Sequence, residues 1–424
     1  MELMLIAPSR QGRQQRFKKS LFPPLGLTMV AAATPSDVKI SIIDENIEAI
    51  DIQKGVDLVG ITATTVTANR AYNLADTFRQ RGIKVVLGGI HPSFMPIEAS
   101  QHADAVVIGE AEGIWPQVIQ DFKNGKLKSI YQQIKRPSLA GLPIPRRDLL
   151  SKKGYIIEQA ISTTRGCPYA CSFCTVTSYF GHTYRCRPLE EIIKEIETLN
   201  SKKFTAFLDD NIVGHTKFAK ELFRALIPYK MRWGSQASIT VARDDELLKL
   251  ATDSGCRILL IGFESLSPAN LKSVNKGINK VEEYENAIRK IHSYGIAIHG
   301  FFIIGFDFDD EDIIKKTIKF ARKMRLESAQ FDILTPYPGT SLFKYMDDSN
   351  RIITKDWSKY GYQLLFKPKS ISIEKLQELH KQAWKEFYSL PSIIFRLRIP
   401  YPSLIRLWAI NLFHCFHWHS KSRI

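Results

Sequence analysis

The chain has 424 residues, of which 44% are hydrophobic and 24% charged, and its formal net charge is +16. These values exclude a disordered or fibrous protein, and the length predicts two or three domains. The excess of basic residues favours an anionic partner such as phosphate groups, nucleic acid or an anionic membrane. A solvated basic face would give the same balance.

The cysteine content and the apolar runs predict a cytoplasmic protein. Six cysteines, three of them clustered, do not resemble the disulfide framework of a secreted protein. The N-terminal run MELMLIA has no basic stretch before it and predicts a strand rather than a signal peptide. Runs of about 18 or more uncharged apolar residues are absent, so no membrane-spanning helix is expected. Peripheral association with the inner face of the membrane remains open.

Residues 1–135 predict a Rossmann-like (flavodoxin-like) domain built on a parallel sheet. Helical patterns such as ANRAYNLADTFRQRG separate short apolar runs at 3–7, 38–44, 58–62, 84–89 and 105–109. Strands that are apolar on both faces and alternate with helices form parallel sheets through βαβ crossovers. Ligands of such sheets bind beyond the carboxyl ends of the strands, here the loops at 8–10, 62–64, 88–91 and 109–110.

A proline-rich linker at 136–154 leads to a second series of βα units. Apolar runs at 156–163, 204–210, 232–238, 258–264, 296–305 and 329–336 predict its strands. Residues 155–340 therefore predict a partial (β/α)6 barrel of the TIM type, in which active-site residues gather at the C-terminal strand ends. Residues 341–424 predict a helical extension with one amphipathic helix at 371–389.

Three cysteines follow the first predicted barrel strand. Cys167, Cys171 and Cys174 have the spacing C-x3-C-x2-C. Closed zinc sites and iron–sulfur cages normally take four protein ligands, so three thiolates leave one coordination position open for a small chelator. Phe173, directly before the third cysteine, would shield the cluster and belongs to the expected cofactor contacts. The alternatives are a zinc site completed by His182 and three ordinary buried cysteines.

The segment GCPYACSFC is similar to the signature of the radical S-adenosylmethionine (SAM) superfamily. The resemblance implies a [4Fe–4S] cluster on the three cysteines, with the amino and carboxylate groups of SAM on the remaining iron. It also implies reductive cleavage of SAM to a 5′-deoxyadenosyl radical, and hence a one-electron reductant such as flavodoxin or ferredoxin. Arg165, beside the cluster, would tune its charge or pair with a nearby acid.

The same resemblance assigns SAM contacts to residues at later strand ends. Asp209 and Asp210, in FLDDN, stand where the family holds the ammonium group of SAM, although Asp210 or Asn211 would also serve as a helix N-cap. Gln236, in WGSQAS, would reach the methionyl or ribose part of SAM, or be an interior amide. Glu264, in LLIGFES, resembles the family's ribose-binding glutamate, and a carboxylate in so apolar a run needs a partner.

Residues 1–390 together resemble the branch of the superfamily with an N-terminal cobalamin-binding domain, through FPPLGLTMVAAATP, DLVGITATT, VVLGGIHPSFMP and VVIGEAEG. The cobalamin contacts that the resemblance implies are Thr62, Thr64, Gly88, Gly89, His91 and Gly109. Glycine pairs permit a flat ligand to approach the backbone closely. The loop PSRQGR after the first strand lacks the histidine of the D-x-H-x-x-G motif, so cobalamin is expected without a lower-axial histidine. Alternatively, the domain is a relic that no longer binds cobalamin.

The resemblance favours a class B, cobalamin-dependent methyltransferase acting on an unactivated carbon of a small-molecule or lipid-like substrate. One alternative is a radical cyclase or carbon–carbon coupling enzyme acting on a tetrapyrrole or lipid without methyl transfer. Others are a tRNA-modifying methylthiotransferase and a cluster-bearing binding module without catalysis. The methylthiotransferase has little support, because no cysteine precedes Cys167 and no β-rich RNA-binding end is visible. No nucleic-acid partner is therefore expected.

The C-terminal stretch from Ile393 to Trp418 interleaves aromatic and basic residues, and further basic residues follow it. This pattern is typical of a segment that docks on an anionic membrane, although the same residues would equally cover the open edge of a partial barrel. The basic residues concerned are Arg396, Arg398, Arg406, Lys421 and Arg423.

The remaining cysteines and histidines carry no assigned function. Cys186 and Cys256 are interpreted as core thiols. The C-terminal group is interpreted as incidental rather than as a metal site, and it consists of His414, Cys415, His417 and His419.

Overall fold

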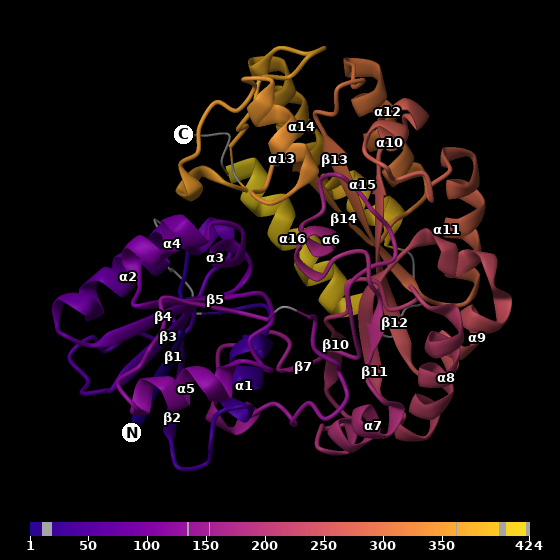
Figure 1. Cartoon of the computed structure of the whole chain (residues 1–424). Coiled ribbons are helices and arrows are strands. Elements are labelled where there is room, and N and C mark those ends of the chain that lie inside the picture. Colours follow the sequence, from indigo (N-terminus) through magenta and orange to yellow (C-terminus); the bar gives the residue numbers. More distant parts are fainter. Residues whose placement is uncertain (11–18, 134, 152, 362, 398–403, 421–424) are drawn as a thin grey trace.

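The computed structural model describes residues 1–10, 19–133, 135–151, 153–361, 363–397 and 404–420. Two α/β units lie side by side, and the last helices pack against the second unit (Figure 1). Each unit is built on its own sheet of six parallel strands. A short antiparallel ribbon of β8 (Thr164–Arg165) and β9 (Arg185–Cys186) brackets helix α6 (Thr175–Phe180).

The N-terminal sheet has the strand order β2-β1-β3-β4-β5-β6, and its pairs are all parallel. Its strands are β1 (Glu2–Ala7), β2 (Lys39–Asp44), β3 (Leu58–Thr62), β4 (Lys84–Gly88), β5 (Ala105–Ile108) and β6 (Ile130–Gln132). Its central strands are apolar on both faces because helices cover both sides. One side packs α2 (Ala68–Gln80) and α4 (Pro96–His102), and the other packs α1 (Leu25–Ala32) and α5 (Trp115–Lys123).

The second sheet has the order β14-β13-β12-β11-β10-β7, again with parallel pairs. Its strands are β7 (Gln159–Ile161), β10 (Phe204–Phe207), β11 (Arg232–Ala237), β12 (Cys256–Glu264), β13 (Ala297–Ile304) and β14 (Ser328–Ile333). Its outer helices bury one apolar core against the strands, and they are α7 (Leu189–Glu197), α8 (Thr216–Leu226), α9 (Asp245–Asp253), α11 (Tyr284–Ser293) and α12 (Glu311–Lys323). β7 and β14 stand at opposite edges and are not paired with each other, so the barrel is open, which confirms the predicted fold class of a partial barrel.

The predicted strands of both sheets are confirmed, each overlapping its expected range. The exception is β6, which the sequence did not indicate. This strand has three residues, of which only Tyr131 is buried, so it is too short to give an apolar run or a recognisable periodic pattern. Its place at the sheet edge explains the weak signal.

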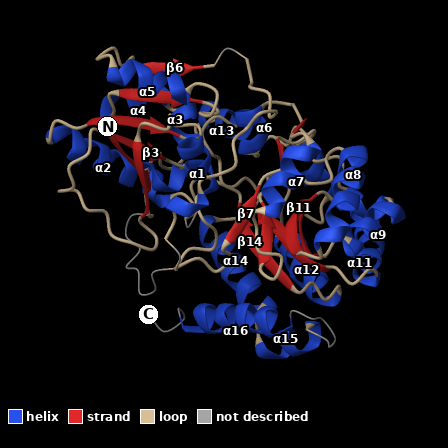
Figure 2. Cartoon of the chain, turned by 90° about the horizontal axis from the view of Figure 1, so that it is seen from below, coloured by secondary structure: helices blue, strands red, loops and turns tan. Residues whose placement is uncertain are grey.

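The C-terminal extension is helical, as expected. It comprises α13 (Ser341–Asp348), α14 (Ile373–Phe387), α15 (Leu390–Arg396) and α16 (Leu404–Ser420), and α14 matches the predicted amphipathic helix. Figure 2 shows α15 and α16 lying together against the barrel. In the part of the chain that the structure describes, no helix combines the length and apolar character needed to cross a bilayer.

Arg396 is buried. One of the two predictions for this stretch would have exposed its charge to an anionic membrane. Its guanidinium donates to the carbonyl oxygens of Leu326 (2.7 Å) and Phe387 (3.0 Å) and to Oδ1 of Asn411 (2.9 Å). Arg396 therefore fastens α15 and α16 to the start of β14, as expected of helices that cover the barrel edge. The other basic residues of the pattern lie outside the described residues or side chains, and they are Arg398, Arg406, Lys421 and Arg423.

Candidate active site

The cysteine loop, residues 166–174, joins β8 to α6 at the C-terminal end of the barrel. Gly166 begins it with a φ of +91°, and a Cβ here would lie 2.1 Å from the carbonyl oxygen of Thr183. Only glycine therefore permits the turn. The amide of Gly166 donates to Oδ2 of Asp210 at 3.0 Å, which fixes the backbone directly before Cys167.

The three thiols share one partly buried environment. Burial raises the pKa of each thiol, that of Cys171 to about 11, and the charge of Cys167 acts on the other two. The positive charge of Lys276 opposes this rise at all three thiols. The side-chain amide of Asn211 lies 3.9 Å from Sγ of Cys167. Three thiols on one loop, with a cation that acts on each of them and an amide donor near the first, fit a cluster held by three thiolates.

A single-ion metal site has no counterpart among the described residues. There, no three His, Cys, Asp or Glu side chains are grouped to hold one metal ion. His182, the alternative fourth zinc ligand, is exposed. His414, Cys415 and His417 of the C-terminal group are likewise not arranged to hold a metal ion. The side chain of His419 lies outside the described residues.

Two adjacent carboxylates after β10 have different surroundings. Oδ1 of Asp209 accepts hydrogen bonds from the amides and hydroxyls of Thr163 and Thr164, at 2.5 to 3.0 Å. Burial raises the pKa of Asp209 to about 6. Asp210 instead lines a cavity. The residue that caps α8 is His215, so the helix-cap alternative for the acids does not apply to this helix. Asp209 thus holds the strand that leads to the cysteines, and Asp210 is open to a ligand.

Glu264 forms a buried ion pair with Lys276, whose Nζ lies 3.1 Å from Oε1. The backbone of Glu264 has a φ of +64° at the bulged end of β12, a strained conformation for a residue with a side chain. Gly262 provides the space, because a Cβ there would lie 2.2 Å from Oε1 of Glu264. The side-chain amide of Asn279 donates to the carbonyl oxygens of Gly262 (2.8 Å) and Phe263 (3.1 Å). Such supported strain is characteristic of functional positions.

Gln236 and Phe173 complete the residues expected to contact SAM. The side chain of Gln236 is exposed, so it is not an amide satisfied inside the barrel. The ring of Phe173 meets that of Phe306 edge to face, with centroids 6.3 Å apart. Phe306 follows β13, so Phe173 leans over the same end of the barrel. The SAM contacts of these side chains stay predictions.

A cavity of ≈ 300 Å³ lies between the two α/β units. Its wall on the N-terminal unit is mainly apolar and rich in glycine, and it includes four predicted cobalamin residues, Thr62, Gly88, Gly89 and Gly109. On the barrel side the cavity reaches Ser162, Thr164, Arg165 and Asp210. Strand ends without side chains let a flat ligand approach the backbone, so this wall fits cobalamin.

Two other residues expected at cobalamin lie away from that wall. Thr64 is exposed on the turn after β3, and it is not among the described residues lining the cavity. His91 is fully buried, with its ring 5.0 Å from that of Trp357. Their cobalamin contacts stay predictions. Of the histidine-free loop at 8–13, the structure describes residues 8–10, and the guanidinium of Arg10 donates to the carbonyl oxygen of Tyr360.

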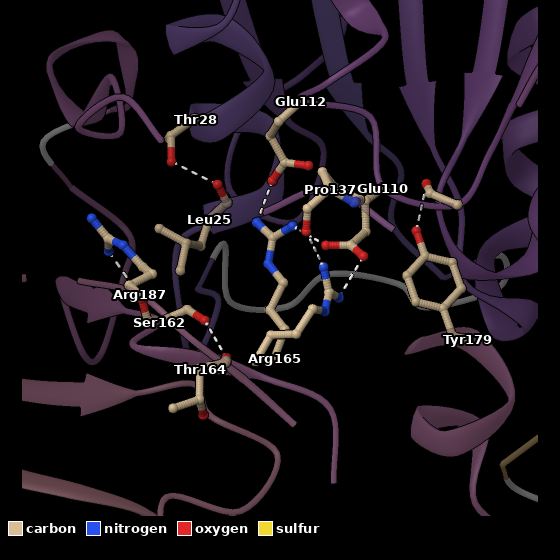
Figure 3. Close-up of polar contacts among 12 residues, drawn as sticks. Leu25, Thr28, Glu110, Glu112, Pro137, Ser162, Thr164, Arg165, Tyr179 and Arg187 are labelled. Atoms are coloured by element: carbon tan, nitrogen blue, oxygen red, sulfur yellow. Dashed lines mark hydrogen bonds and ion pairs between the residues drawn. The ribbon is translucent and has the colours of Figure 1, made fainter. Parts of the chain in front are cut away.

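Acidic residues of the N-terminal unit face arginines of the barrel at the rim of the cavity (Figure 3). Glu110 accepts hydrogen bonds from Nη1 of Arg165 and Nη2 of Arg185, each at 2.5 Å, and Glu112 pairs with Nη2 of Arg165. Burial alone opposes the charge of Arg165, but Glu112 and Glu110 together raise its pKa above the ordinary value. Pairing with acids, one of the two expected roles of Arg165, is therefore confirmed.

Sequence reasoning missed three charged residues of this region. Lys276 stands in SVNKGIN, where no strand end or motif singles it out. Glu110 and Glu112 stand in VVIGEAEG, which contributed to the resemblance without a role for either carboxylate. A buried glutamate such as Glu264 requires a cation, and that requirement was the one available signal for Lys276.

Comparisons with known proteins match both units. The Radical SAM superfamily matches residues 161–321, and the B12 binding domain matches residues 19–119. The bacteriochlorophyllide d C-12(1)-methyltransferase of Chlorobaculum tepidum is 34% identical, over 93% of this chain and 89% of the relative. The bacteriochlorophyllide d C-8(2)-methyltransferase of the same organism is 32% identical, over 89% and 88%. The radical SAM methyltransferase TsrM of Kitasatospora setae has the same fold, with a TM-score of 0.72 at 15% identity over 100% of this chain and 98% of that one.

The chain therefore belongs to the radical SAM superfamily, in the branch of cobalamin-dependent methyltransferases with an N-terminal B12-binding domain. It is an enzyme, and its cofactors are a [4Fe–4S] cluster, SAM and cobalamin. The cysteine loop would hold the cluster, and the cavity between the units would hold part of the cobalamin.

Proposed function

We propose that this enzyme transfers a methyl group to an unactivated carbon at the periphery of a hydrophobic ring-shaped molecule, with tetrapyrrole pigments as the leading class. The observation that carries the proposal is the cavity that joins the glycine-rich strand ends of the B12-binding unit to Asp210 of the barrel. Because the cavity reaches from the glycine-rich wall to Asp210, SAM bound at Asp210 would lie close to cobalamin bound at the wall. The two bacteriochlorophyllide methyltransferases support the choice of a tetrapyrrole.

Each group of residues has a separate task in this proposal. In the loaded enzyme, SAM at the cluster supplies a 5′-deoxyadenosyl radical for hydrogen abstraction, and cobalamin supplies the methyl group. Asp210 would accept hydrogen bonds from the ammonium group of SAM, and Lys276 would pair with its carboxylate. Glu264 would accept the ribose hydroxyls. Because these side chains are largely withdrawn from water, their charges act strongly on the ligand.

The inner wall of the barrel supports a flat, hydrophobic substrate. On β13, His299, Phe301 and Ile303 alternate with buried neighbours and so face the barrel interior. On β14, Gln330 and Asp332 have this orientation, and the amide of Gln330 donates to both carboxylate oxygens of Asp332 (3.0 and 2.8 Å). These two strands thus offer aromatic and aliphatic side chains next to an amide and one carboxylate, which suits a ring system with a hydrogen-bond donor at its edge.

The experiment that tests this function uses protein reconstituted with iron, sulfide and hydroxocobalamin. It is incubated anaerobically with dithionite, SAM carrying a trideuteriomethyl group, and bacteriochlorophyllide d or a related chlorophyllide. The expected product is the pigment with one added deuterated methyl group, together with 5′-deoxyadenosine. A pigment with a new ring or carbon–carbon bond and no added methyl group would replace the proposal by a radical cyclase or coupling enzyme.

We also propose a small acidic electron carrier, a flavodoxin or ferredoxin, as the physiological reductant. The net charge of +16 complements an acidic partner and would favour rapid encounter at low ionic strength. The test compares 5′-deoxyadenosine formation driven by reduced flavodoxin at low and high salt. A rate that does not fall as salt increases would contradict electrostatic recognition of the carrier.

For the C-terminal helices we propose contact with an anionic membrane. Ile410, Phe413 and Phe416 recur at three-residue spacing on α16 and are 48–70% exposed. The chain carries basic residues and no acidic residue after Glu386, which favours anionic lipid over a basic partner. Full-length protein should float with phosphatidylglycerol vesicles, and Phe413→Ser/Phe416→Ser should not. The control, Ile97→Ser, removes an apolar residue of α4 that is also exposed, at 79%. Equal flotation of all three proteins would contradict the proposal.

A further inference from the structure

Four ionised side chains join the B12-binding unit to the barrel beside the cysteine loop (Figure 3). Arg165 pairs with both Glu110 and Glu112, and Arg185 pairs with Glu110 from the neighbouring strand of the ribbon. Two guanidinium groups meet two carboxylates, so the group as a whole is neutral. Each side chain is at most 17% exposed, so salt screens these contacts much less than surface ion pairs.

A second attachment lies on the other side of the cysteine loop. The hydroxyl of Tyr179, on α6, donates to the carbonyl oxygen of Gly109 at 2.7 Å. The amide of Gly109 donates to Oγ of Ser93 at 2.9 Å, and the ring of Phe94 meets that of Tyr179 edge to face. The cysteine loop is therefore tied to the segment 109–112 through residues on both of its flanks.

The same segment forms part of the cavity wall. Gly109, Glu110 and Glu112 line the cavity together with Arg165 and Tyr179. Arg165 is separated from the first cysteine by Gly166 alone, whose own amide is held by Asp210. A shift of the segment 109–112 would therefore move the start of the cysteine loop, because the intervening backbone has little freedom.

We infer that these contacts form an interdomain clamp, with Arg165 as the positioning residue that sets the cysteine loop against the cobalamin wall. The clamp consists of Gly109, Glu110 and Glu112 on one unit and of Arg165, Tyr179 and Arg185 on the other. The identity of the ligand at the wall rests on the proposed function, whereas the clamp rests on the contacts themselves. Its role is alignment, since a methyl donor and a radical precursor held on different domains must keep a fixed separation.

The test measures backbone hydrogen exchange in the full-length protein before any cofactor is added. In Glu110→Gln/Glu112→Gln, exchange should accelerate about tenfold in 163–180 and in 105–114, because two buried guanidinium groups lose their charged partners. Exchange in 216–253, which holds α8 and α9, should stay as in the unaltered protein. The matched control is Glu246→Gln, which removes exposed ion pairs with Lys220 and Arg224 and should change neither segment.

A second readout links the clamp to the cofactor. After reconstitution with iron and sulfide, the double variant should keep its iron but retain hydroxocobalamin about tenfold more weakly on gel filtration. Unchanged exchange in 163–180 would overturn the clamp. An equal acceleration throughout, including 216–253, would also overturn it, since that result reports general loss of stability. If the unaltered enzyme methylates no pigment, the proposed function fails while the exchange result still decides the clamp.

Two milder variants keep the inference testable should the double variant fold poorly. Arg165→Lys retains the charge, but one ammonium group cannot reproduce a forked contact with two carboxylates, so intermediate exchange is expected. Tyr179→Phe removes one hydrogen bond and should accelerate exchange two- to threefold in the same segments. Exchange identical to that of the unaltered protein in both variants would contradict the geometry.

Discussion

The two parallel sheets of this protein carry different kinds of residue at their carboxyl ends, although residues of both units line one cavity. In the N-terminal sheet, β4 ends in Gly88 and β5 is followed by Gly109, and the wall at these strand ends is mainly apolar. In the barrel, strand ends carry Asp210 and Glu264, and Lys276 stands nearby. Bare backbone admits a large flat ligand, whereas paired charges hold a small zwitterion. One fold principle, ligand binding at carboxyl strand ends, therefore serves two cofactors through the residues placed there.

The largest expected effect is loss of the iron–sulfur cluster from the barrel. Cys171→Ala should abolish the iron–sulfur absorption after anaerobic reconstitution, and with it 5′-deoxyadenosine formation, because two thiolates do not hold the cluster. Cys186→Ala is the control, since this half-buried thiol lies on β9 outside the cysteine loop. Normal iron content in Cys171→Ala would contradict the cluster assignment.

The next largest effect is weaker cobalamin binding at the N-terminal sheet. Gly88→Val should weaken hydroxocobalamin binding about a hundredfold, because its branched side chain would fill space at the cavity wall. A Cβ at position 88 meets Val107 at an ordinary 3.8 Å, so the fold should tolerate the change. Circular dichroism and thermal unfolding provide the control. Cobalamin retention as in the unaltered protein would show that the glycine wall is not the binding surface.

Removing the cation of the barrel site gives a smaller effect. Lys276→Met should weaken SAM binding about tenfold, or ~1.4 kcal/mol, measured by equilibrium binding to the reconstituted protein. Lys272→Met, four residues earlier and exposed, provides a control of the same chemistry. Equal SAM affinity in the two variants would remove Lys276 from the site.

The smallest effect concerns the loop after β13 and appears in stability alone. Burial raises the pKa of Asp309 to about 6, although the amides of Gly305 and Phe306 oppose the shift. A carboxyl with a raised pKa contributes stability that is fully present below its unfolded value and is lost as pH rises through about 6. Asp309→Asn should remove this loss, on the order of 1 kcal/mol, in thermal unfolding at pH 4.5 and 7.5. Parallel pH profiles would contradict the assignment.

Patterns within short windows predicted most of the fold. Apolar runs bounded by turns located the strands of both sheets except β6, and the cysteine spacing located the cluster loop. These signals are local, because a strand that is buried on both faces has a continuous run of apolar residues in its own sequence. Asp210 and Glu264 followed from their places at strand ends, and the structure puts both beside the cavity or the cysteines.

Contacts between distant segments could not be predicted in this way. His91 stands beside the Gly88–Gly89 pair in the chain, yet its ring packs against Trp357, which no local pattern brings near. Arg396 belongs to a stretch whose sequence pattern is typical of a membrane interface, yet its guanidinium donates to the backbone carbonyls of Leu326 and Glu327, directly before β14. Glu110 and Arg165 are 55 residues apart and meet only because two domains dock. Sequence reasoning did not predict these partners, because they depend on how distant segments pack together.

The most direct test of the central claim is the cofactor content of one reconstituted chain. Anaerobic reconstitution with iron, sulfide and hydroxocobalamin, followed by gel filtration, should give a full [4Fe–4S] complement and one cobalamin per chain. Cys171→Ala should lose the cluster while keeping cobalamin, and Gly88→Val should lose cobalamin while keeping the cluster. A protein that retains the cluster and never retains cobalamin would contradict the account of two cofactor sites on one cavity.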